Sequence, residues 1–505
     1  MTELDQRTAP TTQLMSNAVE PATVHETHSA YILMLGSFAF KMKKAVKTDF
    51  LDFSTVDSRW DAVEREYTLN ARFAPKVYLG IAELTDPSGG RSEPLLKMLG
   101  LPASAKLSAL AAAGTDPTEQ LSTIARILAE VHQRSPRNET IDHEGTREAL
   151  RGRWSANIRE LRTLSHGILD TTVVDAVEAH SARYLNGRGS LFATRIGNRR
   201  VVDGHGDLLA DDIFCMPDGP QILDCLDFDD KLRYVDGIDD AACLAMDLEY
   251  ELRPDAARFF LDAYMEAACD APPPSLVSHY IAYRATVRAK VACIRALQGG
   301  AKSTADAVAH ARLALKHLES ATVTLTLVGG LPGTGKSTLA TALAERIGAV
   351  ALSSDVVRKE LAGLEPSDPQ PSAVGEGLYT PSITDHTYAE LLRRARTQLA
   401  AGRSVIIDAS WSDPGMRERA RLLAMLGCAE LVEIECTAPQ TVSLHRIDTR
   451  RSHVSDATRE VYEAMSRTRG TWPTATVIDC GSTVDESVEA AFATWTSTVG
   501  SLVPG

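Results

Sequence analysis

Apolar and polar positions alternate with a short period over the first hundred residues. Apolar runs typical of strands stand at 30–35, 38–46, 76–84 and 94–101, and one segment of helical spacing stands at 59–73. Gly36 and Ser37 separate the first two runs, which is typical of a hairpin. We therefore expect a small β-rich lobe with one helix at 25–101, preceded by a disordered polar leader at 1–24.

From residue 118 onward the period lengthens to that of a helix. In the segment 119–133, apolar residues such as Leu121, Ile124 and Leu128 recur on one helical face. Further helical stretches are expected at 144–166, 170–185, 238–251, 254–269, 274–297 and 302–320. A strand–loop–strand pattern at 200–228 interrupts them. The pattern predicts a helix-rich lobe at 102–320.

Strand and helix patterns alternate over the last third of the chain. Buried strands are expected at 322–328, 349–352, 404–407, 430–436 and 475–479, with helices between them. Such alternation predicts a parallel sheet with crossover helices. The expected fold class is an α+β N-terminal half followed by an α/β domain with a parallel sheet at 321–500.

The length, net charge and cysteine spacing of the chain exclude some classes of protein. The chain has 505 residues, more than one core usually holds, and a formal net charge of −14. That acidic balance argues against a nucleic-acid-binding surface, although a nest of backbone N–H groups can still bind an anionic nucleotide. None of the eight cysteines stands at a C-x-x-C spacing, which favours reduced thiols. The start lacks a signal-peptide pattern and no apolar run could span a bilayer, so we expect a cytoplasmic protein without membrane contact.

The strand expected at 322–328 leads into a glycine-rich run that opens a helix. The run and the residue after it are Gly330, Leu331, Pro332, Gly333, Thr334, Gly335, Lys336, Ser337 and Thr338. This G-x-x-x-x-G-K-S spacing is typical of a P-loop, whose backbone N–H groups and helix N-terminus face the phosphates of ATP. We expect Lys336 to reach the β- and γ-phosphates and Ser337 to bind Mg²⁺. A simple glycine-rich turn is the alternative.

Carboxylates and arginines follow the P-loop at the ends of later strands. Asp355, with Arg358 one helical turn beyond, suits a base for an acceptor hydroxyl beside a clamp for an anionic group. The alternative for Asp355 is a helix N-cap. Asp408 ends an apolar strand and is expected to act through a water of the Mg²⁺ shell. Arg446 and Arg450 suit a lid that stabilises the transferring phosphoryl group, or else belong to a solvated helix face.

These motifs resemble the P-loop kinases that include polynucleotide 5′-kinases, gluconate kinases and zeta-type kinases. The resemblance rests on the P-loop, on S-S-D-x-x-R at 353–358 and on I-I-D-A-S-W-x-x-x-x-x-R at 406–417, and it covers about 320–500. It implies that Asp355 is the base that takes the proton of the acceptor hydroxyl. It also implies that Arg417 is a further site residue.

A second group of carboxylates stands in the N-terminal half. Asp207 ends the sequence H-G-D, and Asp224 and Asp227 lie in an apolar run at 222–228 that we expect to be a strand. One carboxylate to accept a hydroxyl proton and another to hold Mg²⁺ is what transfer from ATP requires. Because Asp224 and Asp227 are an odd number of residues apart, only one should reach the metal from a regular strand. Turn-forming aspartates are the alternative.

The H-G-D sequence and the acidic run after it resemble the aminoglycoside phosphotransferase family, which has the protein-kinase-like fold. The resemblance implies Asp207 as the catalytic base and Asp227 as a metal ligand, with Asp224 as the runner-up. Where the family has a metal-binding Asn, this chain has Asp212. A carboxylate there can still bind Mg²⁺, but it adds negative charge beside the triphosphate.

Two lysines of the small lobe support the same resemblance. Lys41 and Lys43 share one face of the strand expected at 38–46. Either could pair with the α- and β-phosphates while a helix carboxylate holds it, as in kinases. Glu66 is the best candidate for that carboxylate. A solvated basic strand edge is the alternative for each lysine.

Taken together, the chain is similar to a bacterial family that fuses an aminoglycoside phosphotransferase-like half, with a kinase-like two-lobe fold, to a P-loop kinase half. The resemblance implies a kinase that phosphorylates the hydroxyl of a small polar metabolite, such as a sugar or aminocyclitol, with two potential Mg·ATP sites. The alternative is a P-loop kinase regulated by a catalytically weak, nucleotide-sensing N-terminal half. Phosphorylation of an aminoglycoside antibiotic is a third hypothesis.

Overall fold

The computed structural model describes residues 23–27, 29–47, 52–85, 89–251, 254–300, 302–365, 377–449 and 457–500. The chain divides into two compact units. Unit 1 takes in residues 1–110 and 211–228, and unit 2 takes in 111–210 and 229–505. Among the described residues, no helix combines the length and the apolar character that crossing a membrane requires.

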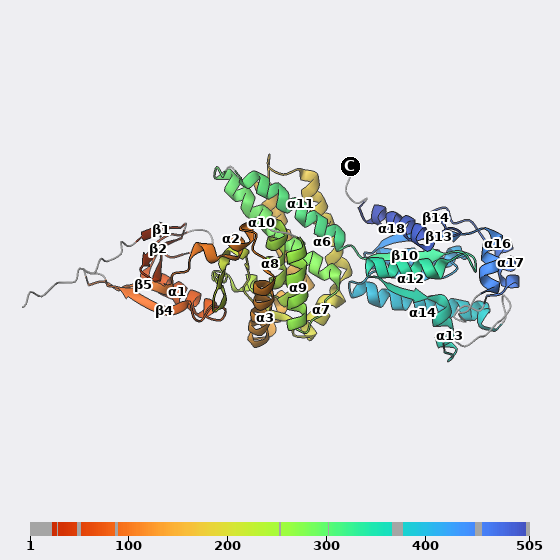
Figure 1. Cartoon of the computed structure of the whole chain (residues 1–505), viewed down its shortest axis with the longest axis horizontal. Coiled ribbons are helices and arrows are strands. Elements are labelled where there is room, and N and C mark those ends of the chain that lie inside the picture. Colours follow the sequence, from red (N-terminus) through yellow and green to blue (C-terminus); the bar gives the residue numbers. More distant parts are fainter. Residues whose placement is uncertain are drawn as a thin grey trace, which may run out of the picture. The chain divides into compact units, whose positions relative to one another are not determined.

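Unit 1 contains a five-stranded antiparallel sheet and one long helix. The strands are β1 (Thr23–Glu26), β2 (Ala30–Leu35), β3 (Phe38–Lys43), β4 (Tyr78–Leu84) and β5 (Glu93–Leu99), in the order β1-β2-β3-β5-β4 (Figure 1). Strand β1 begins at Thr23, inside the segment expected to be a leader; residues 1–22 lie outside the described residues. Helix α1 (Val56–Asn70) starts at a capping box of Thr55 and Ser58. It packs on β4 and β5.

A later segment of the chain completes unit 1. Strands β7 (Ile213–Met216) and β8 (Gly219–Ile222) form an antiparallel hairpin. The run expected to be a strand at 222–228 was predicted wrongly, because β8 ends at Ile222 and Asp224 has a φ of 63°. That left-handed conformation interrupts the alternation of a strand. Leu223 still joins a buried apolar cluster with Val63 of α1.

The first part of unit 2 is helical, as its apolar pattern predicts. Its elements are α3 (Thr118–Arg134), α4 (Glu139–Glu144), α5 (Arg147–Leu164), α6 (Thr171–Gly187), α7 (Gly189–Gly197), α8 (Gly237–Glu251), α9 (Pro254–Ala267), α10 (Pro274–Leu297) and α11 (Ser303–Ser320), with the short strands β6 (Val201–Asp203) and β9 (Tyr234–Asp236). Helix α8 is buried almost all round, because α3, α9 and α10 all pack against it (Figure 1). The loops beside β6 and β9 therefore rest on a rigid helical base.

The second part of unit 2 is a parallel sheet. Its strands are β10 (Thr324–Gly329), β11 (Val350–Ser353), β12 (Val405–Asp408), β13 (Glu430–Thr437) and β14 (Thr476–Asp479), in the order β11-β12-β10-β13-β14. The helices are α12 (Lys336–Ile347), α13 (Ser354–Leu361), α14 (Pro381–Ala400), α15 (Pro414–Leu426), α16 (Gln440–Asp448), α17 (Arg459–Thr468) and α18 (Val484–Gly500) (Figure 1). With right-handed crossovers, this strand order puts α12 on one face and α14 and α15 on the other. The predicted fold class is confirmed in both halves.

The helical part of unit 2 makes hydrogen bonds to the loops that precede two of the parallel strands. Arg188 donates to the carbonyl oxygen of Gly427 at 2.8 Å, and Ser275 donates to that of Gly402 at 2.6 Å. Both carbonyls precede strands, β13 and β12 respectively. These contacts lie at the amino ends of the strands, whereas ligands of parallel sheets bind at the carboxyl ends.

Candidate functional site

The turn after β10 has the backbone that a phosphate cradle needs. Gly330, Gly333 and Gly335 have φ values of 143°, 78° and 100°, all in the region that favours glycine. A Cβ on Gly330 would lie 2.5 Å from the carbonyl oxygen of Cys436, and one on Gly333 would overlap the carbonyl oxygen of Ser443. Helix α12 begins directly after Gly335. The turn is therefore closely packed from behind, and its N–H groups meet a helix N-terminus.

The predicted metal ligands Ser337 and Asp408 meet at this turn. Asp408 ends β12, next to Val328 of β10, and only 6% of its surface is exposed. Burial raises the pKa of Asp408, while the charge of Lys336 and a hydrogen bond from Ser337 oppose that rise. The second carboxylate oxygen, Oδ1, has no hydrogen-bond partner. A buried carboxylate with a free oxygen beside a hydroxyl fits Mg²⁺, which proteins hold through one or two such oxygens together with substrate phosphates.

Asp355 and Arg358 form an ion pair on the neighbouring strand–helix junction. Ser353, the last residue of β11, lies next to Asp408 in the sheet. Ser353 is also the N-cap residue of α13, so the alternative of Asp355 as the N-cap is wrong. Instead the Asp355 carboxylate accepts a hydrogen bond of 2.6 Å from Nη1 of Arg358. The guanidinium lies 4.6 Å from the ring centre of Tyr379, which orients it further.

One cavity of about 1050 Å³ joins most of the predicted residues of the C-terminal domain. Its lining includes Gly333, Gly335, Lys336, Ser337, Thr338, Asp355, Asp408 and Arg446. Arg446 donates to the carbonyl oxygens of Cys480 at 2.9 Å and Thr334 at 3.4 Å, so it is tied to the P-loop and does not belong to a freely solvated face. Arg450 lies outside the described residues. The lining also includes Cys480 and Thr483, which no motif had indicated.

Arg417 lies outside the large cavity. It is buried, donates to the carbonyl oxygen of Thr471 at 3.2 Å and lies 5.3 Å from the ring centre of Trp472. It does not line the large cavity but a small void beside Gly330 and Leu331. Pro332 lies in the turn of the P-loop, and the side chain of buried Thr334 donates to the carbonyl of Leu331 at 2.8 Å.

The lysines of unit 1 gather around one glutamate. Glu66 of α1 is buried and contacts Lys41 at 2.7 Å and Lys43 at 2.6 Å. The lysines also reach the acidic segment: Lys43 lies 3.0 Å from Asp227 and Lys41 lies 3.7 Å from Asp224. Burial raises the pKa of Glu66, but the two lysines outweigh burial and bring it down to about 2. Glu66 is therefore an anion fixed between two cations.

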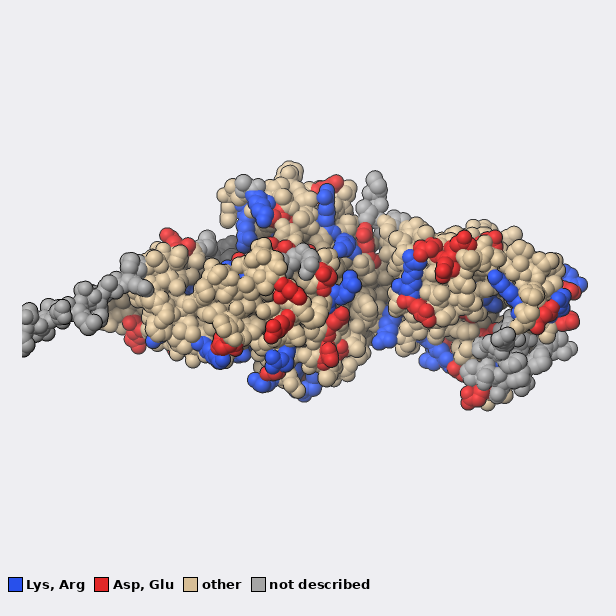
Figure 2. Space-filling model, in the orientation of Figure 1, with Lys and Arg blue, Asp and Glu red and all other residues tan. Residues whose placement is uncertain are grey.

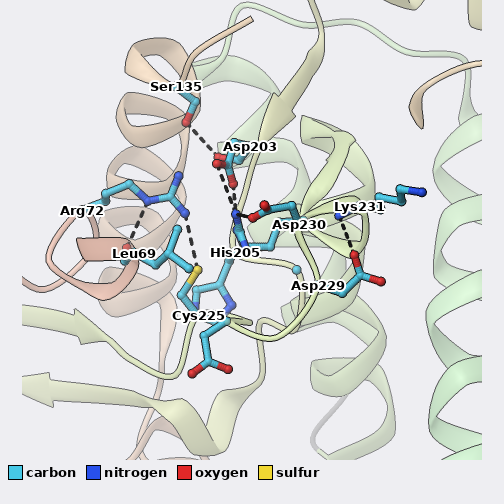
Figure 3. Close-up of polar contacts among 12 residues, drawn as sticks. Leu69, Arg72, Ser135, Asp203, His205, Cys225, Asp229, Asp230 and Lys231 are labelled. Atoms are coloured by element: carbon cyan, nitrogen blue, oxygen red, sulfur yellow. Dashed lines mark hydrogen bonds and ion pairs between the residues drawn. The ribbon is translucent and has the colours of Figure 1, made fainter. Parts of the chain in front are cut away.

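The reasoning that separated Asp224 from Asp227 was wrong. Both carboxylates contact lysines of the same face of β3, because the left-handed φ of Asp224 removes the strict alternation of a strand. The backbone of this segment is held by Asn70, whose side chain accepts from the N–H of Cys225 at 2.8 Å. Arg72 donates to the sulfur of Cys225 at 3.4 Å (Figure 3). Asp212 ends a short 3-10 turn directly before β7, and its carbonyl accepts from the N–H of Leu223 at 2.9 Å.

The loop of Asp207 belongs to unit 2 and is held by buried polar groups. Asp240 of α8 accepts from the backbone N–H groups of His205 at 2.6 Å and Gly206 at 2.9 Å. Arg284 of α10 donates to the carbonyl of Gly206 at 2.5 Å. Ser135, the residue after α3, supports the strand before the loop by donating to the carbonyl of Asp203 (Figure 3). These bonds leave the Asp207 side chain 44% exposed at the tip of a fixed turn, 3.8 Å from Arg288.

The residues predicted for the N-terminal site thus divide between the units. Lys41, Lys43, Glu66, Asp212 and Asp227 belong to unit 1, and Asp207 belongs to unit 2. Within the described ranges, no three His, Cys, Asp or Glu side chains gather as a self-sufficient metal site.

A protein-family model and a full-length relative match this chain. Residues 325–471 match the model of the AAA domain family. The uncharacterized protein Rv2004c of Mycobacterium tuberculosis (strain ATCC 25618 / H37Rv) is 44% identical over 476 residues, which are 94% of this chain and 96% of that protein. The chain belongs to the same family as this mycobacterial protein. Its C-terminal third is a P-loop nucleotide-binding domain, as its motifs predict.

Solved structures of kinases are also similar to parts of the chain. An unliganded sugar kinase from Janibacter sp. HTCC2649 is 18% identical and covers 36% of this chain and 99% of its own, with a TM-score of 0.28. A choline/ethanolamine kinase family protein from Mesorhizobium loti is 12% identical and covers 61% of this chain and 96% of its own, with a TM-score of 0.35.

Proposed function

We propose that the chain is an ATP-dependent phosphotransferase that phosphorylates the hydroxyl of a small polar metabolite at its C-terminal P-loop. The observation that carries the proposal is the single cavity lined by Lys336, Ser337, Asp355, Asp408 and Arg446. It combines a phosphate cradle, a buried carboxylate for a metal and a second carboxylate for a proton. These are the parts that transfer of a phosphoryl group to a hydroxyl requires.

Each residue has a role that follows from its position. The backbone N–H groups after Gly330 and the Lys336 ammonium bind the phosphates. Asp355 accepts the proton of the acceptor hydroxyl, and Arg358 holds that carboxylate in place across 2.6 Å. Arg446 places a positive charge next to the P-loop backbone, where negative charge spreads over the transferred group. The acceptor class stays a polar alcohol, such as a sugar or aminocyclitol.

Ser337 and Asp408 are the residues that would hold Mg²⁺. When bound, the ion neutralises phosphate charge and fixes the orientation of the phosphate chain. The free Oδ1 of Asp408 supports this assignment, since a buried carboxylate oxygen without a partner is costly in the absence of a cation or water.

A screen for products tests the proposal. The full-length protein with Mg·ATP is incubated with a panel of small metabolites, and phosphorylated products are identified by mass spectrometry. Lys336→Ala and Asp355→Asn should each lower the initial rate of product formation by at least about 100-fold. The matched control is Lys76→Ala, which removes a lysine from an exposed pair with Asp218. A product that persists in Lys336→Ala would move the activity away from the P-loop.

The N-terminal half has a second candidate function. In unit 1, the Lys43–Glu66 pair favours a second Mg·ATP-binding function, with Asp212 and Asp227 as the proposed metal ligands. In unit 2, Asp207 on its fixed loop stays the proposed catalytic base. The alternative is a nucleotide-sensing half that regulates the P-loop kinase. Asp207→Ala separates these hypotheses in the same screen. Loss of one distinct product supports a second active centre, whereas an unchanged set of products with altered rates supports regulation.

The partners proposed are ATP, Mg²⁺ and a small-molecule acceptor. Acidic and basic side chains are interspersed over the face shown in Figure 2. That mixture offers no extended basic stripe on this face of the described residues, which favours a small acceptor over nucleic acid.

A further inference from the structure

Two thiols lie directly behind the phosphate cradle. Cys436 is in β13 and Cys480 follows β14, the neighbouring parallel strand. The N–H of Cys480 donates to the carbonyl of Thr437 at 2.8 Å, which continues the pairing of the two strands to this point. Both cysteines are buried and belong to one packed cluster, and Cys436 pairs with Ile478, two residues before Cys480. The Cys480 thiol donates to the carbonyl of Ile478 at 3.8 Å. None of the functions proposed above uses this pair.

The pair is packed against the two ends of the P-loop. A Cβ on Gly330 would come 3.3 Å from Cβ of Cys436, and a Cβ on Gly335 would come 3.3 Å from Cβ of Cys480. The carbonyl of Cys480 also accepts from Arg446, which donates in turn to Thr334 of the P-loop. Because the interior is close-packed, a shift of either cysteine must also move the P-loop backbone.

The two thiols differ in reactivity and in access. Cys480 lines the cavity of the P-loop, so a small oxidant in the cavity can reach it. The neighbouring Cys436 thiol lowers the pKa of the Cys480 thiol, against the effect of burial. The neighbouring Cys480, followed by burial, raises the pKa of the Cys436 thiol. Cys480 is thus the thiol that attacks first, and Cys436 is the one positioned to resolve the product.

We propose that Cys436 and Cys480 form an oxidative modification site whose disulfide weakens nucleotide binding at the P-loop. The oxidant is hydrogen peroxide. The Cys480 thiolate attacks one peroxide oxygen and the O–O bond breaks, which gives a sulfenic acid and hydroxide; the hydroxide takes up the proton that the thiol lost and leaves as one water. The sulfur of Cys436 then attacks the sulfenic sulfur, the S–O bond breaks, and the disulfide forms as a second water leaves. Two thiols and one peroxide give one disulfide and two waters.

The inference rests on ATP binding at the P-loop but not on the identity of the acceptor. Forming the S–S bond draws the ends of β13 and β14 together and displaces the Cys480 carbonyl that anchors Arg446. Coupling between two sites is reciprocal, so bound ATP must disfavour the disulfide at equilibrium by the factor by which the disulfide weakens ATP binding. ATP in the cavity also covers the lining that includes Cys480, which should slow the oxidation. Coupling of this kind is commonly worth roughly 5- to 150-fold in affinity.

The test uses the full-length protein, reduced or treated with hydrogen peroxide. Trypsin places Cys480 in the fragment 470–505 and Cys436 in the fragment 422–446, which also contains Cys428. Mass spectrometry should find these fragments joined after oxidation, both in the wild type and in the matched control Cys428→Ser. Saturating Mg·ATP should slow the joining.

Binding of ATP is measured by calorimetry on the same samples. The oxidised wild type should bind ATP at least about fivefold more weakly than the reduced protein, and dithiothreitol should restore the affinity. Cys480→Ser, compared with its own untreated form, should show no effect of peroxide. The proposal is overturned if the two fragments are never joined in the wild type, or if they are joined and the affinity for ATP is unchanged. If the reduced wild type binds no ATP, the proposed function fails, while the joined fragments still report on the thiols.

Discussion

The P-loop cavity of unit 2 and the lysine cluster of unit 1 both gather charge where phosphate chemistry is predicted, but they are built differently. In the cavity, one backbone turn supplies the groups that face the phosphates, and Asp408 keeps a carboxylate oxygen without a partner. In unit 1 the charges all belong to side chains, and Lys41, Lys43 and Glu66 already bind one another. The P-loop cavity thus has a carboxylate oxygen available to a ligand. In the lysine cluster, a ligand would have to bind to lysines that are already paired with Glu66.

The largest expected effect is on the rate of phosphoryl transfer in the P-loop cavity. Lys336→Ala should lower the rate of phosphoryl transfer by roughly 100- to 1000-fold, the usual cost of removing one donor to a developing charge. Steady-state kinetics with the acceptor found in the metabolite screen measures it. A variant with nearly full activity would place the chemistry elsewhere in the chain.

Substitutions in the lysine cluster of unit 1 should lower the free energy of unfolding. Lys43→Met leaves both Glu66 and Asp227 without their closer cation, and breaking a buried pair in this way costs about 3 kcal/mol in the free energy of unfolding. Lys41→Met should cost less, because this lysine is more exposed and its contact with Asp224 is longer. Denaturant unfolding of both variants compares them. Equal losses would mean that the two lysines are interchangeable.

Substitutions of two glycines distinguish the energetic cost of a left-handed backbone from the cost of close packing at the P-loop. Gly348 has a φ of 66° and open space around it, so Gly348→Ala should cost only the conformational penalty of roughly 1–2 kcal/mol. Gly333→Ala adds an overlap with the carbonyl of Ser443 and should also weaken ATP binding. Thermal unfolding and calorimetry on the pair measure both quantities. Similar ATP affinities would show that the cradle tolerates a side chain at Gly333.

The smallest expected effects are opposite responses to pH. The pKa of Glu66 is lowered to about 2, so its contribution to stability is present above its unfolded pKa and is lost as the pH falls towards 2. Burial raises the pKa of Asp247 to about 6, although a hydrogen bond from Ala210 opposes the rise. The folded protein then binds the extra proton, so this contribution is present at low pH and is lost as the pH rises through 6.

Asp247→Asn should therefore flatten the fall in unfolding free energy between about pH 4 and pH 6, and Glu66→Gln should flatten the fall on the acid side of pH 4.5. Urea unfolding across pH 3 to 8 measures both slopes. Each variant serves as the control of the other. A slope that both substitutions leave unchanged would belong to other groups.

The sequence predicts the P-loop, its strand and its helix well because their signal is local. The spacing of glycines specifies a turn, and the periods on either side specify β10 and α12. The helices of unit 2 follow from their apolar period for the same reason. The sequence fails at 222–228, where apolar residues suggest a strand but a left-handed Asp224 turns the chain. Interactions with Tyr78 and Asn70, more than a hundred residues away, hold that turn, and no local pattern carries them.

By itself, then, the sequence determines that a phosphate cradle follows β10 and that carboxylates end the strands beside it. Only the tertiary structure decides which side chains meet. It pairs Asp355 with Arg358, moves Arg417 to a separate void, divides the N-terminal candidates between two units and seats two cysteines behind the cradle. The physical reason is that backbone conformation depends on neighbouring residues, whereas burial and side-chain contacts depend on how distant segments pack.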